Sequence, residues 1–163
     1  MPVMYEKDGA VGIVTLSRPE ARNSWGIDLT EGLSEHFRTM EEDDEIRCAI
    51  LTGDEAGGAF SAGANLKDPN THTVKSAADF IKGIPAWKRN MPFDVLGSFP
   101  KPIIASVNGY AIGIGCIITF CCDLIVASSA ARFADTHARV GLLPGWGLSQ
   151  KLSRLVGILR AKE

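Results

Sequence analysis

The feature that most limits the fold of this chain is an apolar stretch over residues 103–122 that contains no Asp, Glu, Lys or Arg. A helix of this length could cross a bilayer, and Gly109 and Gly113 have the four-residue spacing found where membrane helices pack. However, Asn108-Gly109 is a turn signal that divides the stretch into a strand-sized and a helix-sized piece. We therefore expect both pieces to lie in a buried core, with no membrane partner.

Strand-sized apolar runs alternate with helical patterns along the chain. Asp8-Gly9 suits a type I′ hairpin turn, and the glycine-rich run 53–63 is expected to be a loop. We predict strands over residues 3–7, 10–16, 46–52, 103–107 and 124–127, and helices over 113–122 and 146–155. A helical region is also expected between 74 and 96, broken near Pro85 and Pro92. This alternation predicts an α/β fold with right-handed βαβ connections.

The first helix has the clearest periodicity. Asp28, followed three residues later by Glu31, resembles a capping box at a helix start. Apolar residues then recur at helical spacing, so that one face is expected to contact the core: Leu29, Leu33, Phe37 and Met40.

Charge and cysteine content exclude several classes of function. The net charge is −2 and the pI is about 5.9, so we expect no nucleic-acid partner, because such surfaces have a basic excess. The four cysteines do not have zinc-site spacing, which predicts no metal and a reducing, cytoplasmic compartment. No basic segment followed by an apolar one opens the chain, so no signal peptide is expected.

Two glycine-containing segments, residues 57–66 and 108–116, each follow a predicted strand. Neither has the G-x-x-x-x-G-K-[ST] pattern of a P-loop, and Gly113-x-Gly115 lacks the third glycine of a dinucleotide-binding turn. Taken singly, each segment is explained by tight turns and close packing.

Five segments with defined patterns follow one another along the chain: Leu16–Asn23 (LSRPEARN), Ala59–Leu66 (AFSAGANL), Lys101–Ala111 (KPIIASVNGYA), Cys122–Phe133 (CDLIVA, then ARF) and Val140–Gly145 (VGLLPG). In content and order they resemble the motifs of the crotonase (enoyl-CoA hydratase/isomerase) superfamily, from about residue 10 to the end.

This resemblance implies a crotonase-like (ClpP/crotonase) α/β fold, a spiral of ββα units, in one core domain over residues 1–163. Family chains usually continue for roughly another hundred residues. We therefore expect the chain to be truncated before the C-terminal helices that form trimers. A full-length family fold would assemble as a homotrimer or hexamer.

The resemblance also implies an enzyme of fatty acid metabolism, a lyase or isomerase, that acts on an acyl-CoA thioester. Coenzyme A would enter as part of the substrate, and no permanently bound cofactor is expected. By motif, the backbone N–H groups of Ala64 and Ile114 would form an oxyanion hole for the thioester oxygen. Ile114 replaces a family glycine, so it can serve only if its φ is negative.

Coenzyme A contacts carry over in the same way. The matching positions are Glu20, Ala21, Arg22, Ser24, Ala62, Leu66 and Lys67. Small residues such as Ala62 allow the backbone to approach the ligand. Arg22 and Lys67 are candidate phosphate partners; alternatively, each is an ordinary surface cation.

The chain departs from the family at both hydratase glutamates, which are replaced by Ile117 and His137. Isoleucine cannot transfer a proton, so two-glutamate hydration is not expected. His137 could be the acid–base group, because imidazole titrates near neutral pH, as in relatives that cleave carbon–carbon bonds. Alternatively, His137 only packs or forms a hydrogen bond, and Asp135, two residues earlier, faces away from it.

Two further functions stay open beside a hydratase/isomerase. One is a non-catalytic CoA-binding or assembly subunit, and the other is a His-dependent hydrolase of thioesters or carbon–carbon bonds. Three other side chains could also approach the site: Asp94, Cys116 and Thr119.

Overall fold

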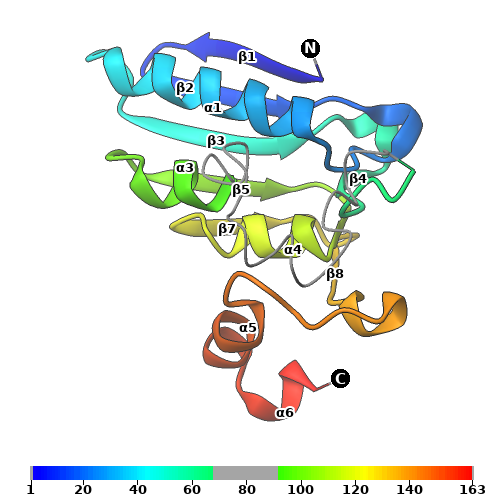
Figure 1. Cartoon of the computed structure of the whole chain (residues 1–163). Helices are drawn as coiled ribbons and strands as arrows, with labels where there is room; N and C mark the ends of the chain where they lie inside the picture. Colours follow the sequence, from blue (N-terminus) through cyan, green and yellow to red (C-terminus); the bar gives the residue numbers. More distant parts are fainter. Residues whose placement is uncertain (1, 68–91, 163) are drawn as a thin grey trace, which may run out of the picture.

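The computed structural model describes residues 2–67 and 92–162, which form two sheets and the helices beside them (Figure 1). The strands are β1 (Val3–Asp8), β2 (Val11–Leu16), β3 (Cys48–Gly53), β4 (Ala59–Ser61), β5 (Ile103–Val107), β6 (Tyr110–Ile112), β7 (Leu124–Ala127) and β8 (Arg132–Ala134). The α-helices are α1 (Ile27–Glu42), α3 (Pro92–Ser98), α4 (Ile114–Thr119), α5 (Leu148–Val156) and α6 (Ile158–Ala161). Short 3₁₀ turns are η1 (Pro19–Ala21), η2 (Glu55–Gly57) and η4 (His137–Val140).

Each sheet is mainly parallel. The larger has the order β1-β2-β3-β5-β7, in which only the β1–β2 pair is antiparallel, and the smaller has the order β4-β6-β8. Strands β3, β5 and β7 are each followed in the chain by a strand of the smaller sheet. This repeated step between the two sheets agrees with the predicted ββα units, and the α/β class is confirmed.

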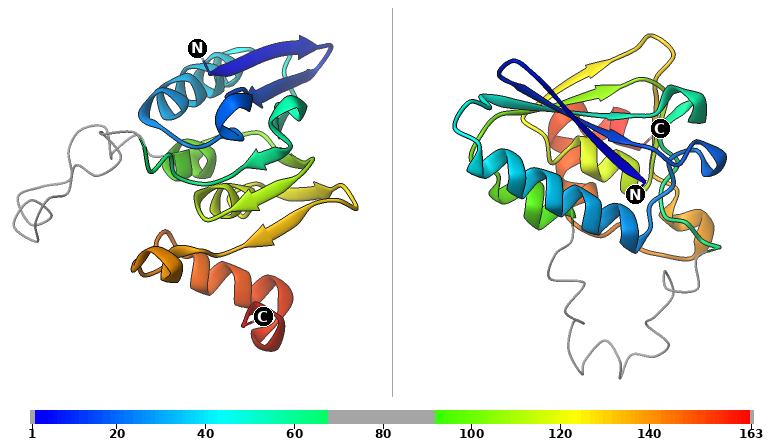
Figure 2. Two further views of the ribbon diagram at one scale, coloured as in Figure 1. Left: turned by 90° about the vertical axis from the view of Figure 1, so that its right-hand side faces the viewer. Right: turned by 90° about the horizontal axis from the view of Figure 1, so that it is seen from above.

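The core lies between the larger sheet and the helices on one of its faces, α1, α3 and α4 (Figures 1 and 2). The predicted face of α1 is confirmed, because its four apolar residues are at most 1% exposed: Leu29, Leu33, Phe37 and Met40. They pack with buried strand residues such as Val14, Leu51 and Ala105. Alternate residues of β2, β3 and β5 face this core, as period-two strands require.

Two local predictions at the N-terminal end are wrong. Asp8 pairs with Val11, so the hairpin turn is Gly9-Ala10, and only Gly9 has a positive φ, whereas type I′ needs two such residues. Gly26 is the N-cap of α1, so Asp28 lies inside the first turn and forms no capping box. Its carboxylate instead pairs with the Arg18 guanidinium.

Other elements differ mainly in length. The predicted glycine-rich loop over 53–63 contains η2 and β4. Helix α4 is shorter than the predicted 113–122, and α5 begins two residues later than predicted. Most of the helical region expected between 74 and 96 falls outside the described residues; its last part is α3, which starts at Pro92.

The apolar stretch that could have spanned a membrane is divided between β5, β6 and α4. No helix among the described residues has the length and apolar character needed to cross a bilayer. The predicted division at Asn108-Gly109 is therefore confirmed.

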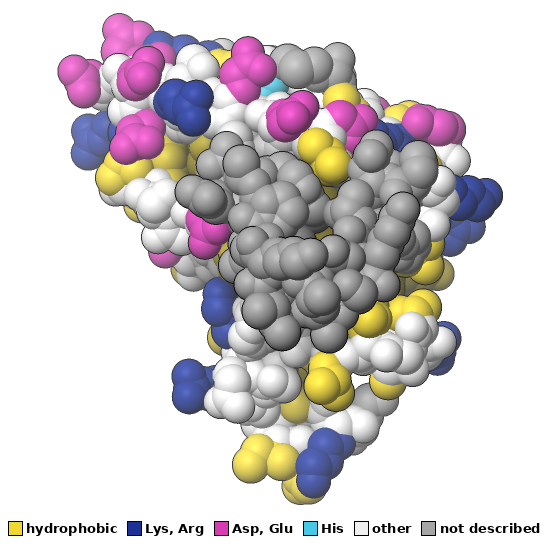
Figure 3. All heavy atoms as spheres, viewed as in Figure 1, with side chains coloured by type: hydrophobic (Ala, Val, Ile, Leu, Met, Phe, Trp, Pro, Cys, Tyr) yellow, Lys and Arg dark blue, Asp and Glu magenta, His cyan; other side chains and the backbone are white. Residues whose placement is uncertain are grey.

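Apolar side chains become exposed toward the end of the chain. All four residues of the edge strand β7 are exposed, and Leu143 and Leu159 are 91% and 81% exposed. Figure 3 shows hydrophobic side chains in the lower part of the molecule, where α5 and α6 lie. The core is thus densest in the first sheet strands and thins toward α6.

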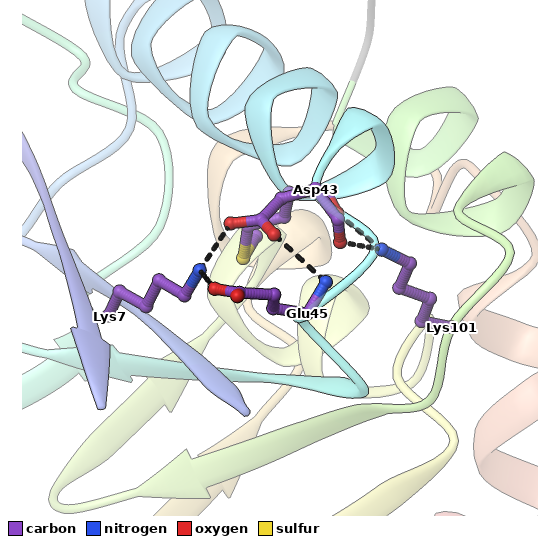
Figure 4. Close-up of polar contacts among 5 residues, drawn as sticks. Lys7, Asp43, Glu45 and Lys101 are labelled. Carbon is purple, nitrogen blue, oxygen red and sulfur yellow. Dashed lines mark hydrogen bonds and ion pairs between the residues drawn. The ribbon is translucent and has the colours of Figure 1, made fainter. Parts of the chain in front are cut away.

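A cluster of charged residues lies at the end of α1, before β3: Lys7, Asp43, Glu45 and Lys101 (Figure 4). The Lys7 Nζ donates to Asp43 (2.7 Å) and Glu45 (2.6 Å), and the Lys101 Nζ donates to the backbone oxygens of Met40 and Asp43 (2.6 Å each). The hydrogen bond from Lys7 holds the pKa of the Asp43 carboxyl below its ordinary value, and Asp43 and Glu45 raise the pKa of Lys7. Lys101 therefore donates to carbonyl groups that have no intrahelical hydrogen-bond partner at the end of α1.

Candidate active site

The smaller sheet brings the predicted site residues to one edge. Strands β4, β6 and β8 are parallel and adjacent, so their carboxyl ends lie together. Ala64, Ile114 and His137 each follow one of these ends within three residues. Ligands commonly bind outside the carboxyl ends of parallel strands, which makes this edge the candidate site.

Glycines allow the two glycine-containing segments to lie in contact. A Cβ on Gly109 would lie 2.6 Å from the carbonyl oxygen of Gly58, and a Cβ on Gly63 would lie 2.8 Å from that of Ile112. A side chain at either position would push the segments apart. The close-packing explanation is therefore correct for these glycines, and the packing itself shapes the site.

The amide of Ala64 takes no part in the hydrogen bonds that hold its segment. Ala64 forms a parallel bridge with Trp25, in which the Trp25 N–H donates to Gly63 (2.7 Å) and the Asn65 N–H donates to Trp25 (2.8 Å). Both bonds use residues flanking Ala64, so its own N–H faces the opposite side. Within the described part of the chain this N–H has no acceptor.

The amide of Ile114 lies close to the same point. Ile114 is the first residue of α4, where N–H groups lack an intrahelical partner, and no acceptor for it occurs in residues 2–67 and 92–162. Its nitrogen lies 3.9 Å from the position that a Cβ on Gly63 would take. Gly113 takes the positive φ (+52°) at this turn, and Ile114 has the negative φ that a β-branched donor at this position needs.

His137 lies beside this helix start. A Cβ on Gly113 would lie 4.0 Å from its Cε1 atom, and the His137 side chain is only 11% exposed. The His137 Nδ1 atom is 2.5 Å from the Asp135 Oδ1 atom, and the His137 backbone N–H donates to the same oxygen (3.0 Å). The expectation that Asp135 faces away is therefore wrong, because an Asp side chain readily accepts the N–H two residues on.

Ile117 lies in an apolar cluster rather than a polar one. It is fully buried with Cys116 and Leu148, and the partly buried side chains packed against this group are Phe93, Phe120, Cys121 and Leu152. The position that matches the first glutamate of the family motif is therefore occupied by an apolar side chain packed among other apolar side chains.

The other candidate side chains do not supply a reactive group. Burial raises the pKa of the Cys116 thiol to about 12, and the negative charge of Asp135 adds to this shift. The thiol therefore stays protonated at neutral pH and is not a thiolate nucleophile. The Thr119 hydroxyl donates to the Cys116 carbonyl (2.7 Å), and Asp94 is exposed on α3.

The two predicted CoA-binding segments lie against one another. The Ala62 N–H donates to the Arg22 carbonyl (3.0 Å), and Trp25 and Ala64 of the same two segments form a parallel bridge. Asn23 is fully buried and fixes the first segment, because its side-chain amide donates to the carbonyls of Asp54 (3.0 Å) and Ala59 (2.8 Å). The fold therefore brings together two segments that lie far apart in the sequence.

Within these segments the predicted contacts differ in exposure. Glu20, Arg22, Leu66 and Lys67 are exposed, whereas Ala21 and Ala62 are half-buried. Ser24 is 7% exposed, and its hydroxyl has no hydrogen-bond partner among the described residues. The arrangement offers two cations at the surface and small residues toward the amides.

The sequence matches a known enzyme family. Residues 6–163 fit the sequence model of the Enoyl-CoA hydratase/isomerase family. The chain belongs to this family. A short-chain-enoyl-CoA hydratase of Clostridium acetobutylicum is 39% identical over 163 residues, covering 99% of this chain and 59% of that protein. A probable peroxisomal enoyl-CoA hydratase 1 of Arabidopsis thaliana is 35% identical over 158 residues, 97% of this chain and 56% of that protein.

Solved structures agree with this enoyl-CoA hydratase/isomerase membership. An enoyl-CoA hydratase of Mycobacterium tuberculosis H37Rv has a TM-score of 0.78 at 36% identity, covering 99% of this chain and 62% of that one. The predicted crotonase-like fold is thereby confirmed. The chain spans less than two thirds of the length of these relatives.

One residue beside the candidate site, Asp135, was not predicted from the sequence. Asp135 was considered only in the alternative in which it faces away from His137, yet it contacts both the backbone and the ring of that residue. The signal was present in the sequence, because the D-x-H spacing suits a turn in which Asp accepts the N–H two residues later.

Proposed function

We propose that the protein is an enzyme that binds an acyl-CoA thioester and stabilises its enolate with the amides of Ala64 and Ile114. The observation that carries the proposal is that both N–H groups lack an acceptor in the described part of the chain and lie on neighbouring segments, one after β4 and the other at the start of α4. Donors already fixed in place stabilise charge that develops during the reaction. Each such donor contributes about 2.7–4 kcal/mol to transition-state stabilisation in comparable sites.

Coenzyme A would then lie along the paired segments 20–24 and 62–67. The small residues Ala21 and Ala62 leave room for the pantetheine arm beside the backbone. Arg22 and Lys67 are exposed and would meet the phosphates, while Glu20, Ser24 and Leu66 would border the adenosine. The unpartnered Ser24 hydroxyl supports a ligand contact at this place.

His137 would be the acid–base group of this site. Its ring lies beside Gly113, one residue before the Ile114 amide, and it replaces the glutamate of the family motif. Two-glutamate hydration is not part of the proposal, because the first glutamate position holds Ile117 in an apolar cluster. The function proposed is thus proton transfer next to a thioester carbonyl, by one histidine.

One observation favours a second candidate, a CoA-binding subunit without catalysis. Ile117 is fully buried among hydrocarbon side chains, so a polar group that usually assists water addition is absent from that position. Such a subunit would keep the paired CoA segments and lose turnover.

The two candidates are separated by pairing calorimetry with a turnover panel. The chain would be titrated with coenzyme A, then assayed with crotonyl-CoA, β-keto acyl-CoAs and branched acyl-CoAs. The proposal expects binding and turnover of at least one thioester, with crotonyl-CoA a poor substrate. Binding without any turnover would select the non-catalytic subunit, and a folded chain that does neither would contradict both.

A further inference from the structure

Asp135 holds the His137 side chain through a closed pair of contacts. One carboxylate oxygen, Oδ1, accepts the backbone N–H of His137 (3.0 Å) and lies 2.5 Å from the ring Nδ1 atom. An ionised carboxylate can only accept hydrogen bonds, so Nδ1 is the nitrogen that carries the hydrogen. The other nitrogen, Nε2, is left with a lone pair that can take a proton.

The strand pairing fixes this pair relative to α4. Ala134 of β8 is opposite Ile112 of β6, and the Gly113 N–H donates to the Ala134 carbonyl (2.9 Å). The residues that follow, Asp135 and His137, are therefore carried past the start of α4 by backbone hydrogen bonds. The His137 Cε1 atom, bonded to Nε2, lies 4.0 Å from the Cβ position of Gly113.

From this geometry we infer that Asp135 is a positioning residue, which keeps His137 in the Nδ1–H tautomer and directs Nε2 toward the space beside the Ile114 amide. The inference rests on the function proposed above and explains how the tautomer and the orientation of its acid–base group are fixed. Asp135 itself does not touch the substrate.

The proton transfer that this arrangement serves is balanced within the site. The Nε2 lone pair takes a proton from the carbon next to the thioester carbonyl, so an N–H bond forms as the C–H bond breaks. The electron pair moves into the enolate, whose oxygen accepts from the Ala64 and Ile114 amides. The imidazolium that results lies against the ionised Asp135, which stabilises its charge.

The electrostatic reach of Asp135 agrees with this role. Its negative charge adds to the burial that raises the pKa of the Cys116 thiol in the first turn of α4. The side chain of Asp135 is 26% exposed and that of His137 is 11% exposed, so the pair is partly shielded from water. The carboxylate is therefore close enough to the first turn of α4 to influence a charge there.

The decisive variant is Asp135→Asn, which keeps one side-chain oxygen for both the backbone N–H and the ring Nδ1–H but removes the negative charge that stabilises the imidazolium. We expect kcat to fall at least about tenfold, with a change in KM of no more than about twofold, since acid–base groups contribute about 10²–10⁴-fold. The melting temperature should stay close to that of the parent chain.

The matched control is Asp43→Asn at the far end of α1. Asp43 accepts the Glu45 N–H at 2.9 Å in the same kind of two-residue turn, but it faces Lys7 rather than a histidine. Its substitution should leave kcat unchanged. An equal loss of kcat in both variants would overturn the inference.

A readout that needs no turnover is the ¹⁵N chemical shift pattern of the imidazoles, assigned with His137→Gln. We expect His137 to show the Nδ1–H tautomer, and this signature to be lost in Asp135→Ala, which removes the oxygen that both N–H groups contact. The same tautomer in both proteins, or an altered tautomer with unchanged kcat, would overturn the inference. The expected tautomer without turnover of any thioester would instead overturn the proposed function, and with it the catalytic consequence of Asp135.

Discussion

The same two-residue turn occurs before β3 of the larger sheet and after β8 of the smaller sheet, with different partners. Asp43, before β3, accepts the N–H of Glu45 (2.9 Å), and Asp135, after β8, accepts the N–H of His137 (3.0 Å). Asp43 turns its remaining oxygen to the Lys7 ammonium, whereas Asp135 holds an imidazole whose Nε2 atom has no hydrogen-bond partner within residues 2–67 and 92–162.

What differs is the surrounding backbone. Near Asp43 the open carbonyls of the α1 end accept from Lys101, so that end of the sheet is closed by its own side chains. Near Asp135 the amides of Ala64 and Ile114 have no acceptor among the described residues. The same local turn thus stabilises the fold before β3 and leaves groups available for a ligand after β8.

The largest effect is expected from His137→Gln. The variant loses the nitrogen that takes the proton, so kcat should fall by about 10²–10⁴-fold while CoA affinity changes little. Steady-state kinetics and calorimetry measure the two quantities. His36→Gln is the control, because His36 contacts the Val3 carbonyl (3.3 Å) and stacks on Tyr5; an equal loss there would erase the contrast.

Next comes the amide of Ile114. Ile114→Pro removes the N–H at the first position of a helix, where proline is tolerated, and kcat should fall by about 10²–10³-fold. Ile114→Ala keeps the amide and should retain most of the activity. If both variants lose activity alike, the side chain rather than the N–H matters, and the oxyanion assignment is wrong.

A smaller effect, on stability, is expected from Ile117→Glu. The carboxyl would enter the cluster with Phe93 and Leu148, which should lower the free energy of unfolding by about 1–3 kcal/mol. Urea unfolding measures this. Val126→Glu, on the exposed edge strand, should change it by no more than about 0.5 kcal/mol. Equal stability of the two variants would show that Ile117 is not packed as described.

The smallest effect is expected at the Asp43 turn beside the larger sheet, from Lys7→Met. The exposed ion pairs are screened by salt, so a slight decrease in melting temperature should disappear at high ionic strength. Because the folded-state pKa of Asp43 is lowered, its contribution is complete above the ordinary Asp pKa and is lost as the pH falls through the lowered value. The difference between variant and parent should shrink over that acidic range; a constant difference would contradict the pairing.

The sequence predicted the elements that local pattern determines. The apolar face of α1 and the strands β5 and β7 were predicted because their spacing or β-branched runs identify them without tertiary information. The three-residue strands β4, β6 and β8 were missed. Glycines beside β4 and β6 suggested loops, and all three strands exist only through pairing with distant segments.

For the site too, the sequence predicted the residues but not their arrangement in space. The residues Ala64, Ile114 and His137 came from motif order, but their meeting at one edge depends on the register of the smaller sheet, which no local pattern encodes. The buried surroundings of Ile117 likewise depend on α3 and α5 packing over α4.

The most direct test of the account is a crystal structure of the chain with a bound acyl-CoA. The account predicts that the thioester oxygen lies about 2.7–3.1 Å from the amide nitrogens of both Ala64 and Ile114, with the His137 Nε2 atom on the side of the adjacent carbon. A thioester oxygen bonded to neither amide, in a complex with the CoA otherwise ordered, would contradict it.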